Sequence, residues 1–213
     1  MRDEEFDLFI EEFGEPCQVW EVSQEDLIFW KDKLPDQLLK YWQNEGFCSF
    51  GDGLIDIVNP SYLATTVNEW LANTSISTID NFHGFAKTAF GNLYVCGEKT
   101  GAVLNINCQS NTIIATATNL KEKTMDLKDR SIRAFFGASF KSDFDRLDTS
   151  KNNLFNQAYK KLGKLDFDEI YAFSPALVLG GMPCLDNLKK FKLIEHLSSL
   201  KQVAAAKVIK CSR

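Results

Sequence analysis

The apolar residues of this chain change their spacing near residue 85, and this change restricts the possible folds more than any other feature. Before it, apolar residues recur at helical intervals, as Phe6, Phe9, Ile10 and Phe13 do. After it come four short segments rich in β-branched and aromatic residues, divided by turn-forming sequences: 85–90, 93–97, 102–107 and 112–118. The pattern predicts helices followed by an antiparallel meander.

Three helices are predicted in the first 72 residues. The first ends at Gly14, and the second, in the sequence LPDQLLKYWQNEG, has Pro35 in its first turn and Gly46 as its stop. The third begins after Asn59, a good N-cap. Trp42 and Trp70 lie on the apolar stripes of the second and third helices, so we expect them to be core anchors.

Helical spacing returns in the last third of the chain, after a polar stretch at 119–131 and a short helix near Ile132. Ser150 is a candidate cap for a helix that runs to Leu162, residues 169–179 read as one or two strands, and the last helix covers 193–204. The whole pattern predicts an α+β fold, with helices packed on a mainly antiparallel sheet and a smaller α/β C-terminal part.

Charge is divided unevenly along the chain. Residues 1–60 contain 15 acidic and 4 basic residues, a net charge of -11, whereas the whole chain has a net charge of -5. Acidic faces of this kind are either simply solvated or steer a basic partner toward the surface, and both interpretations stay open. Direct binding of nucleic acid by this acidic part is disfavoured.

The residues that usually carry catalysis or hold metals are sparse. The six cysteines form no CxxC pair, which argues against a zinc site and for reduced thiols. Asp143, Asp145 and Asp148 lack the glycine and the closing glutamate of an EF-hand loop. No common catalytic motif is present, His83 lies in a turn-like segment, and His196 flanks an amphipathic helix. We therefore expect no catalytic residue, cofactor or metal.

Targeting signals are also missing from the sequence. The first nine residues, MRDEEFDLF, are acidic where a secretory signal would be basic and then apolar. The longest weakly polar stretch, 171–185, is shorter than the roughly 20 residues that a membrane helix needs. A cytoplasmic protein is the expectation.

Several short motifs, in a fixed order, resemble a known family. The N-terminal ones are Phe13-Gly14-Glu15-Pro16, Leu34-Pro35 with Leu38, Leu39, Tyr41, Trp42 and Gly46, then Gly51-Asp52-Gly53, Asn59-Pro60, Phe90-Gly91-Asn92-Leu93-Tyr94 and Gly97-Glu98-Lys99-Thr100-Gly101. Together they resemble the GAD-like domain of bacterial proteins.

A second set of motifs lies toward the C-terminus: Leu162-Gly163-Lys164-Leu165, Asp168-Glu169, Tyr171-Ala172-Phe173, Pro175-Ala176-Leu177 and Gly180-Gly181. These are similar to the C-terminal domain of immunity proteins that protect against type VI secretion DNase toxins. The resemblance implies a GAD-like domain at 1–118, a connecting segment at 119–131 and an immunity-protein C-terminal domain at 132–208.

The resemblance also implies a function: a bacterial, non-enzymatic immunity protein that neutralises a cognate nuclease toxin in a stoichiometric complex. Two alternatives stay open, a protein- or RNA-interaction module related to tRNA-charging accessory domains and an enzyme with an unfamiliar site. A nuclease presents a positive face to DNA, so we expect partner-binding residues among the acidic loops. The candidates are Asp52, Asp56, Asp80 and the neighbouring His83, with Asp143 and Asp145 as a second patch.

Overall fold

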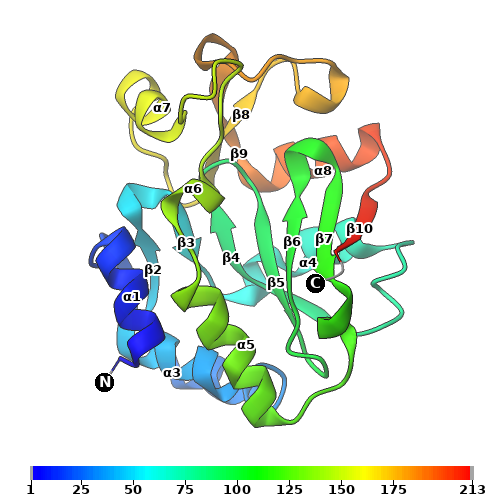
Figure 1. The fold of residues 1–213 in the computed structure, drawn as a ribbon. Helices are drawn as coiled ribbons and strands as arrows, with labels where there is room; N and C mark the ends of the chain where they lie inside the picture. The colour runs from blue at the N-terminus through cyan, green and yellow to red at the C-terminus, as the bar shows by residue number, and fades with distance from the viewer. Residues whose placement is uncertain (1, 212–213) are drawn as a thin grey trace.

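The computed structural model describes residues 2–211 and contains a large sheet with helices on both faces (Figure 1). The helices are α1 (Glu4–Phe13), α2 (Gln24–Trp30), α3 (Asp36–Glu45), α4 (Pro60–Leu71), α5 (Met125–Gly137), α6 (Lys141–Phe144), α7 (Phe155–Leu162) and α8 (Leu193–Val203). The strands are β1 (Gln18–Trp20), β2 (Phe47–Phe50), β3 (Ile55–Ile57), β4 (Phe82–Thr88), β5 (Leu93–Gly97), β6 (Val103–Asn107), β7 (Thr112–Thr116), β8 (Glu169–Phe173), β9 (Leu188–Lys192) and β10 (Lys207–Cys211).

The main sheet has eight strands in the order β1-β2-β3-β4-β5-β6-β7-β10. Neighbouring strands are antiparallel throughout except at the end, where β10 runs parallel to β7. Strands β4 to β7 form the meander that the sequence predicts. A mainly antiparallel sheet combined with helices confirms the α+β fold.

The predicted helix ends are largely confirmed. The side chain of Asp3 accepts a hydrogen bond from the backbone N–H of Phe6 at the start of α1, and that of Asn59 accepts one from Ser61 at the start of α4. Gly46 ends α3 with a φ of 81°, and a Cβ there would lie 2.6 Å from the carbonyl oxygen of Trp20. Only glycine fits that position without displacing β1.

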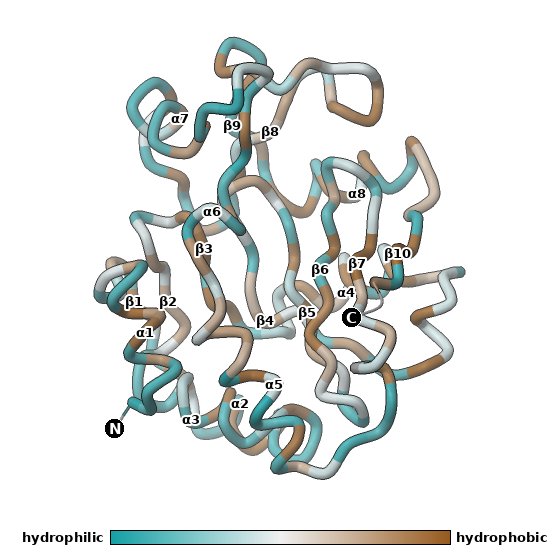
Figure 2. Tube along the Cα trace, in the orientation of Figure 1, coloured by the Kyte–Doolittle hydropathy of each residue, from teal (hydrophilic) through white to brown (hydrophobic). Residues whose placement is uncertain are grey.

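Aromatic side chains fill the core on one face of the sheet, where α1, α3 and α5 pack together (Figure 1). The ring of Phe6 lies 4.4 Å from that of Tyr41 and 5.0 Å from that of Phe136, measured between centroids. On the opposite face, α4 and α8 cover the sheet with aliphatic residues and Trp70. Figure 2 shows hydrophobic residues interspersed along the strands of the sheet. The helices on its two faces cover these residues.

The hairpin of β8 and β9 is fastened to one end of the main sheet (Figure 1). The backbone N–H of Tyr171 donates to the carbonyl of Ala89 at 2.8 Å, and Nε2 of Gln109 donates to the carbonyl of Phe90 at 2.7 Å. A Cβ on Gly91 would lie 2.9 Å from the Ile170 side chain, so the two backbones come into close approach. These contacts join the C-terminal part to the meander.

Several elements differ from the sequence-based expectation. Helices α2 and α6 and strands β1, β9 and β10 were not predicted. The polar stretch 119–131 contains the start of α5, which packs on α1 and α3. These short or charged segments have little apolar periodicity of their own, and their structure depends on the surfaces that they contact.

Two local predictions are wrong. Ser150 does not cap a helix, because α7 begins at Phe155 and its first N–H donates to the Asp145 carboxylate at 2.8 Å. His83 lies within strand β4 and not in a turn. In both cases the partner comes from another segment of the chain. The Asp145 carboxylate accepts from the first N–H of α7, and strand β5 pairs with the strand that contains His83.

We predict that Trp70→Ala lowers the free energy of unfolding by about 3–5 kcal/mol, because Trp70 is completely buried and its removal leaves a large cavity. Trp42, which is 1% exposed, should respond similarly. Denaturant unfolding measures both effects. The control is Phe140→Ala, at a side chain that is 58% exposed, which should change stability by less than about 0.5 kcal/mol. An equal loss in the control would contradict the core assignment.

Candidate functional site

A hollow of about 350 Å³ lies where the N-terminal and C-terminal parts of the chain meet, and we call it the junction hollow. Its floor includes the buried side chains of Phe13, Leu54 and Phe155. The other residues that line it are Gly14, Glu15, Cys17, Gly51, Asp52, Lys141, Asp145, Asn153 and Asn156. An apolar floor with polar and charged groups around it is typical of ligand-binding sites.

Asp52 lies in a tight turn at the junction hollow. Gly51, Asp52 and Gly53 have φ angles of 59°, 60° and 92°, a run of left-handed backbone that glycine and aspartate tolerate better than most residues. The turn connects β2 to β3, and Asp52 is exposed. The Gly-Asp-Gly sequence therefore places one carboxylate in solvent at the hollow.

Asp145, from the second predicted patch, lines the same hollow. Its Oδ1 accepts hydrogen bonds from the backbone N–H groups of Arg146 and Phe155 at 2.6 and 2.8 Å. Burial raises the pKa of this carboxyl, and the backbone hydrogen bonds oppose that rise. Asp145 thus orients α7 as well as lining the hollow, whereas Asp143 is exposed and accepts from the backbone N–H of Phe140.

An acidic stripe that the sequence analysis did not single out extends from the junction hollow along α1. Glu4, Asp7 and Glu11 are exposed at helical spacing on the outer face of α1, and Glu15 continues the line. We define the acidic surface as these four residues with Asp52. The i, i+3, i+7 spacing of the three helical carboxylates was the signal that could have identified it.

Glu15 is fixed in place by Arg2. The two terminal nitrogens of Arg2 donate to the Glu15 carboxylate at 2.9 and 2.6 Å, and the same guanidinium reaches Glu45 at 2.7 Å. These hydrogen bonds lower the pKa of the Glu15 carboxyl. Arg2 therefore connects the acidic surface to α3, which bears Glu45.

Asp56, a predicted partner-binding residue, is buried inside the sheet. It stands opposite Lys87 on the neighbouring strand, and Nζ of Lys87 lies 2.5 Å from its Oδ2. The Phe167 ring lies 5.6 Å from that ammonium, and Lys87 is 1% exposed. The pairing with Lys87 occupies the Asp56 carboxylate within the protein, so we do not retain Asp56 as a partner-binding residue.

Asp80 is also committed to the fold. Its carboxylate accepts hydrogen bonds from the backbone N–H groups of Lys99 and Thr100 and from the Thr100 hydroxyl, at 2.7 to 3.0 Å. It thereby holds the turn between β5 and β6, and it is only 8% exposed. This buried carboxylate is likewise not retained as a partner-binding residue.

His83 lines a separate hollow of about 280 Å³ that includes Asp80 and the end of α4. Nε2 of His83 lies 2.8 Å from a carboxylate oxygen of Glu98, and its ring is 4.8 Å from that of Trp30. The six predicted residues are therefore not one site. The structure brings Asp52 and Asp145 together in the junction hollow and leaves Asp80 and His83 elsewhere.

Among residues 2–211, no three His, Cys, Asp or Glu side chains gather closely enough to hold a metal ion. The His196 ring packs 4.6 Å from that of Phe191, and burial lowers its pKa. All six cysteines are unpaired thiols, and burial raises the pKa of Cys96 to about 12. Over the same residues, no helix is long and apolar enough to cross a bilayer.

We predict that Lys87→Met lowers the free energy of unfolding by about 3–5 kcal/mol, because it leaves the Asp56 carboxylate buried without its counter-ion. The double variant Lys87→Met with Asp56→Leu should recover much of that loss. Urea unfolding of the single and double variants measures the coupling. If Lys87→Met costs less than about 1 kcal/mol, Asp56 is not held by this ion pair.

Comparisons with known proteins agree with this architecture. A solved structure described as Atu4351 from Agrobacterium tumefaciens superposes with a TM-score of 0.80 at 20% sequence identity, covering 93% of this chain and 89% of that one. At this identity the likeness shows the shared fold. A search of curated proteins finds no match.

Two family models match the sequence itself. The GAD-like domain matches residues 4–110, half of the chain, and the domain described as "T6SS immunity protein Tdi1, C-terminal" matches residues 129–204. T6SS denotes the type VI secretion system. Both resemblances expected from the short motifs are thus confirmed, and the chain belongs to the GAD-like domain family, with a segment matching the Tdi1 C-terminal domain after it.

Proposed function

We propose that this protein is an immunity protein that binds a cognate DNase toxin of the type VI secretion system and neutralises it in a stoichiometric complex. The observation that carries the proposal is the match of residues 129–204 to the C-terminal domain of T6SS immunity proteins. A DNase acts on DNA inside the bacterial cell, so we expect the complex to form in the cytoplasm.

The charge distribution supports a nuclease as the partner. A nuclease needs cationic groups to bind phosphates, and the acidic surface of α1 and Asp52 has the complementary sign. The same acidic surface would repel the phosphates of RNA, which weighs against an RNA-interaction module. Of the residues expected from the sequence, the proposal keeps Asp52 and Asp145, which line the junction hollow, and the exposed Asp143.

The rigidity of the acidic surface also suits an inhibitor. The inner face of α1 is held by Phe6, Phe9 and Phe13, all at most 4% exposed, while its outer face bears the carboxylates. Glu15 is held by Arg2. Groups that are already ordered lose little conformational entropy on binding, so more of their interaction energy appears as affinity.

The most direct test is co-expression with a candidate DNase toxin, sought first in the gene immediately upstream. We expect the intact protein to restore the growth of cells that produce the toxin, and to co-purify with an inactive form of the toxin in a fixed ratio, measured by light scattering. Trp70→Ala serves as a control that should lower rescue through loss of folded protein. Growth arrest despite abundant folded protein, with no complex formed, would refute the proposal.

We further predict that association is driven by charge. The triple variant Asp7→Asn, Glu11→Gln and Asp52→Asn should slow association with the toxin about three- to tenfold at low salt and weaken its salt dependence. Stopped-flow measurements at two ionic strengths give both quantities. A variant with the same charge change made outside the acidic surface, Glu122→Gln, Asp186→Asn and Glu195→Gln, should stay within about twofold of the wild type. Equal slowing in both variants would mean that only net charge matters.

A further inference from the structure

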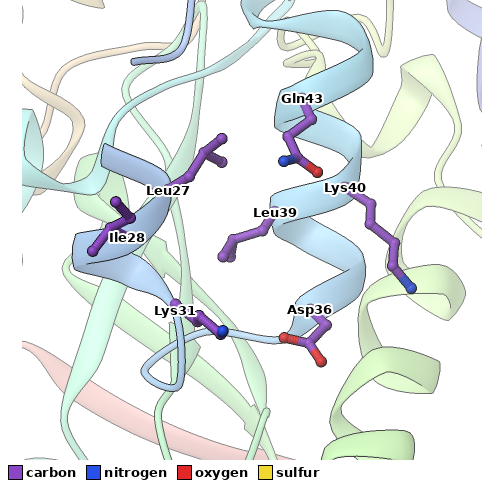
Figure 3. A pocket seen from close by; sticks show the side chains of 7 residues that line it. All are labelled: Leu27, Ile28, Lys31, Asp36, Leu39, Lys40 and Gln43. Atoms are coloured by element: carbon purple, nitrogen blue, oxygen red, sulfur yellow. The ribbon is translucent and has the colours of Figure 1, made fainter. Parts of the chain in front are cut away.

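A groove between α2 and α3 has the features of a second contact surface. Two neighbouring hollows of about 260 and 580 Å³ share Leu27 and Gln43 among their lining residues, and we call them together the α2–α3 groove. Figure 3 shows Leu27 and Leu39 extending toward each other between the two helices, with Lys31 and Asp36 at one end. The floor is apolar because Leu27 and Leu39 are buried there.

The edge of the groove exposes large apolar side chains. Ile28 is 73% exposed, its neighbour Phe29 is 54% exposed, and Val19, which lines the larger hollow, is 56% exposed. Single exposed apolar residues are ordinary, but several beside an apolar groove are typical of protein-binding surfaces. Burying Ile28 would give a partner a strong apolar contact.

The charges of the larger hollow indicate what kind of segment fits. Glu21 and Glu45 line it, and the set of described residues around it includes neither lysine nor arginine. Glu45 is paired with Arg2, which also binds Glu15, so Glu21 is the carboxylate of this hollow that is open to a partner. A basic side chain on the occupant would complement this end.

We propose that the α2–α3 groove binds a short segment of the toxin in which an apolar side chain is followed by a basic one. The apolar side chain packs against Leu27, Ile28 and Leu39, and the basic group faces Glu21. This inference rests on the proposed function and adds an apolar anchor to it. A nuclease is a suitable occupant because its DNA-binding side is rich in basic residues.

The test measures binding of the protein to an inactive form of the toxin identified by the growth-rescue experiment. Ile28→Asp should weaken binding at least about tenfold, chiefly through faster dissociation. Glu21→Lys should weaken it about three- to tenfold. Leu179→Asp, at an apolar side chain that is 62% exposed outside the groove, is the matched control and should stay within about twofold. Ile28 and Glu21 are exposed, so both variants should fold normally.

Two further measurements identify the occupant. Hydrogen exchange of the α2 and α3 amides should slow in the complex, and light scattering should give the same mass for the free wild type and for Ile28→Asp. A wild-type complex that both variants form equally well would overturn the groove proposal and leave the immunity function standing. Failure of the wild type to bind would instead refute the immunity function. A free dimer that Ile28→Asp dissociates, with toxin binding intact, would show that a second copy occupies the groove and overturn the proposal.

Discussion

Packing of aromatic rings between α1, α3 and α5 is the constraint on which the proposed interface depends. Phe6 contacts Tyr41 of α3 and Phe136 of α5, so one buried ring joins three helices. Helix α5 begins before residue 129 and continues into the segment that matches the immunity-protein domain, yet it packs on α1 and α3 of the GAD-like segment. The two matched segments therefore share one core, and this core fixes which face of α1 meets solvent.

That shared core gives the surface two complementary parts. In the proposed complex, the carboxylates on the outer face of α1 and in the Gly51-Asp52-Gly53 turn would act at long range and set the association rate. The α2–α3 groove would add apolar contact, which acts only at short range and would set the dissociation rate. Arg2 connects them by binding both Glu15 and Glu45. We expect charge to bring the toxin in and apolar burial to retain it.

Much of the fold could be predicted from local sequence. Helices α1, α3 and α4 have apolar stripes and recognisable ends, and β4 to β7 are consecutive strands linked by short turns, so nearby residues supply their main signals. The edge strands β1 and β10 could not be predicted in this way. Strand β10 pairs in parallel with β7 after a long intervening chain, and its mostly exposed side chains have no strand-like apolar alternation.

The sequence by itself determined the helices with clear caps, the meander, the burial of Trp42 and Trp70, the acidic first 60 residues and the family. Only the tertiary structure decided which of the candidate carboxylates reach solvent. Asp52, Asp56 and Asp80 look alike in sequence. In the structure Asp56 is buried against Lys87 and Asp80 is buried against the turn at Thr100, while Asp52 stays exposed. A carboxylate's role depends on charges and donors brought near it by folding, and those come from distant positions in the chain.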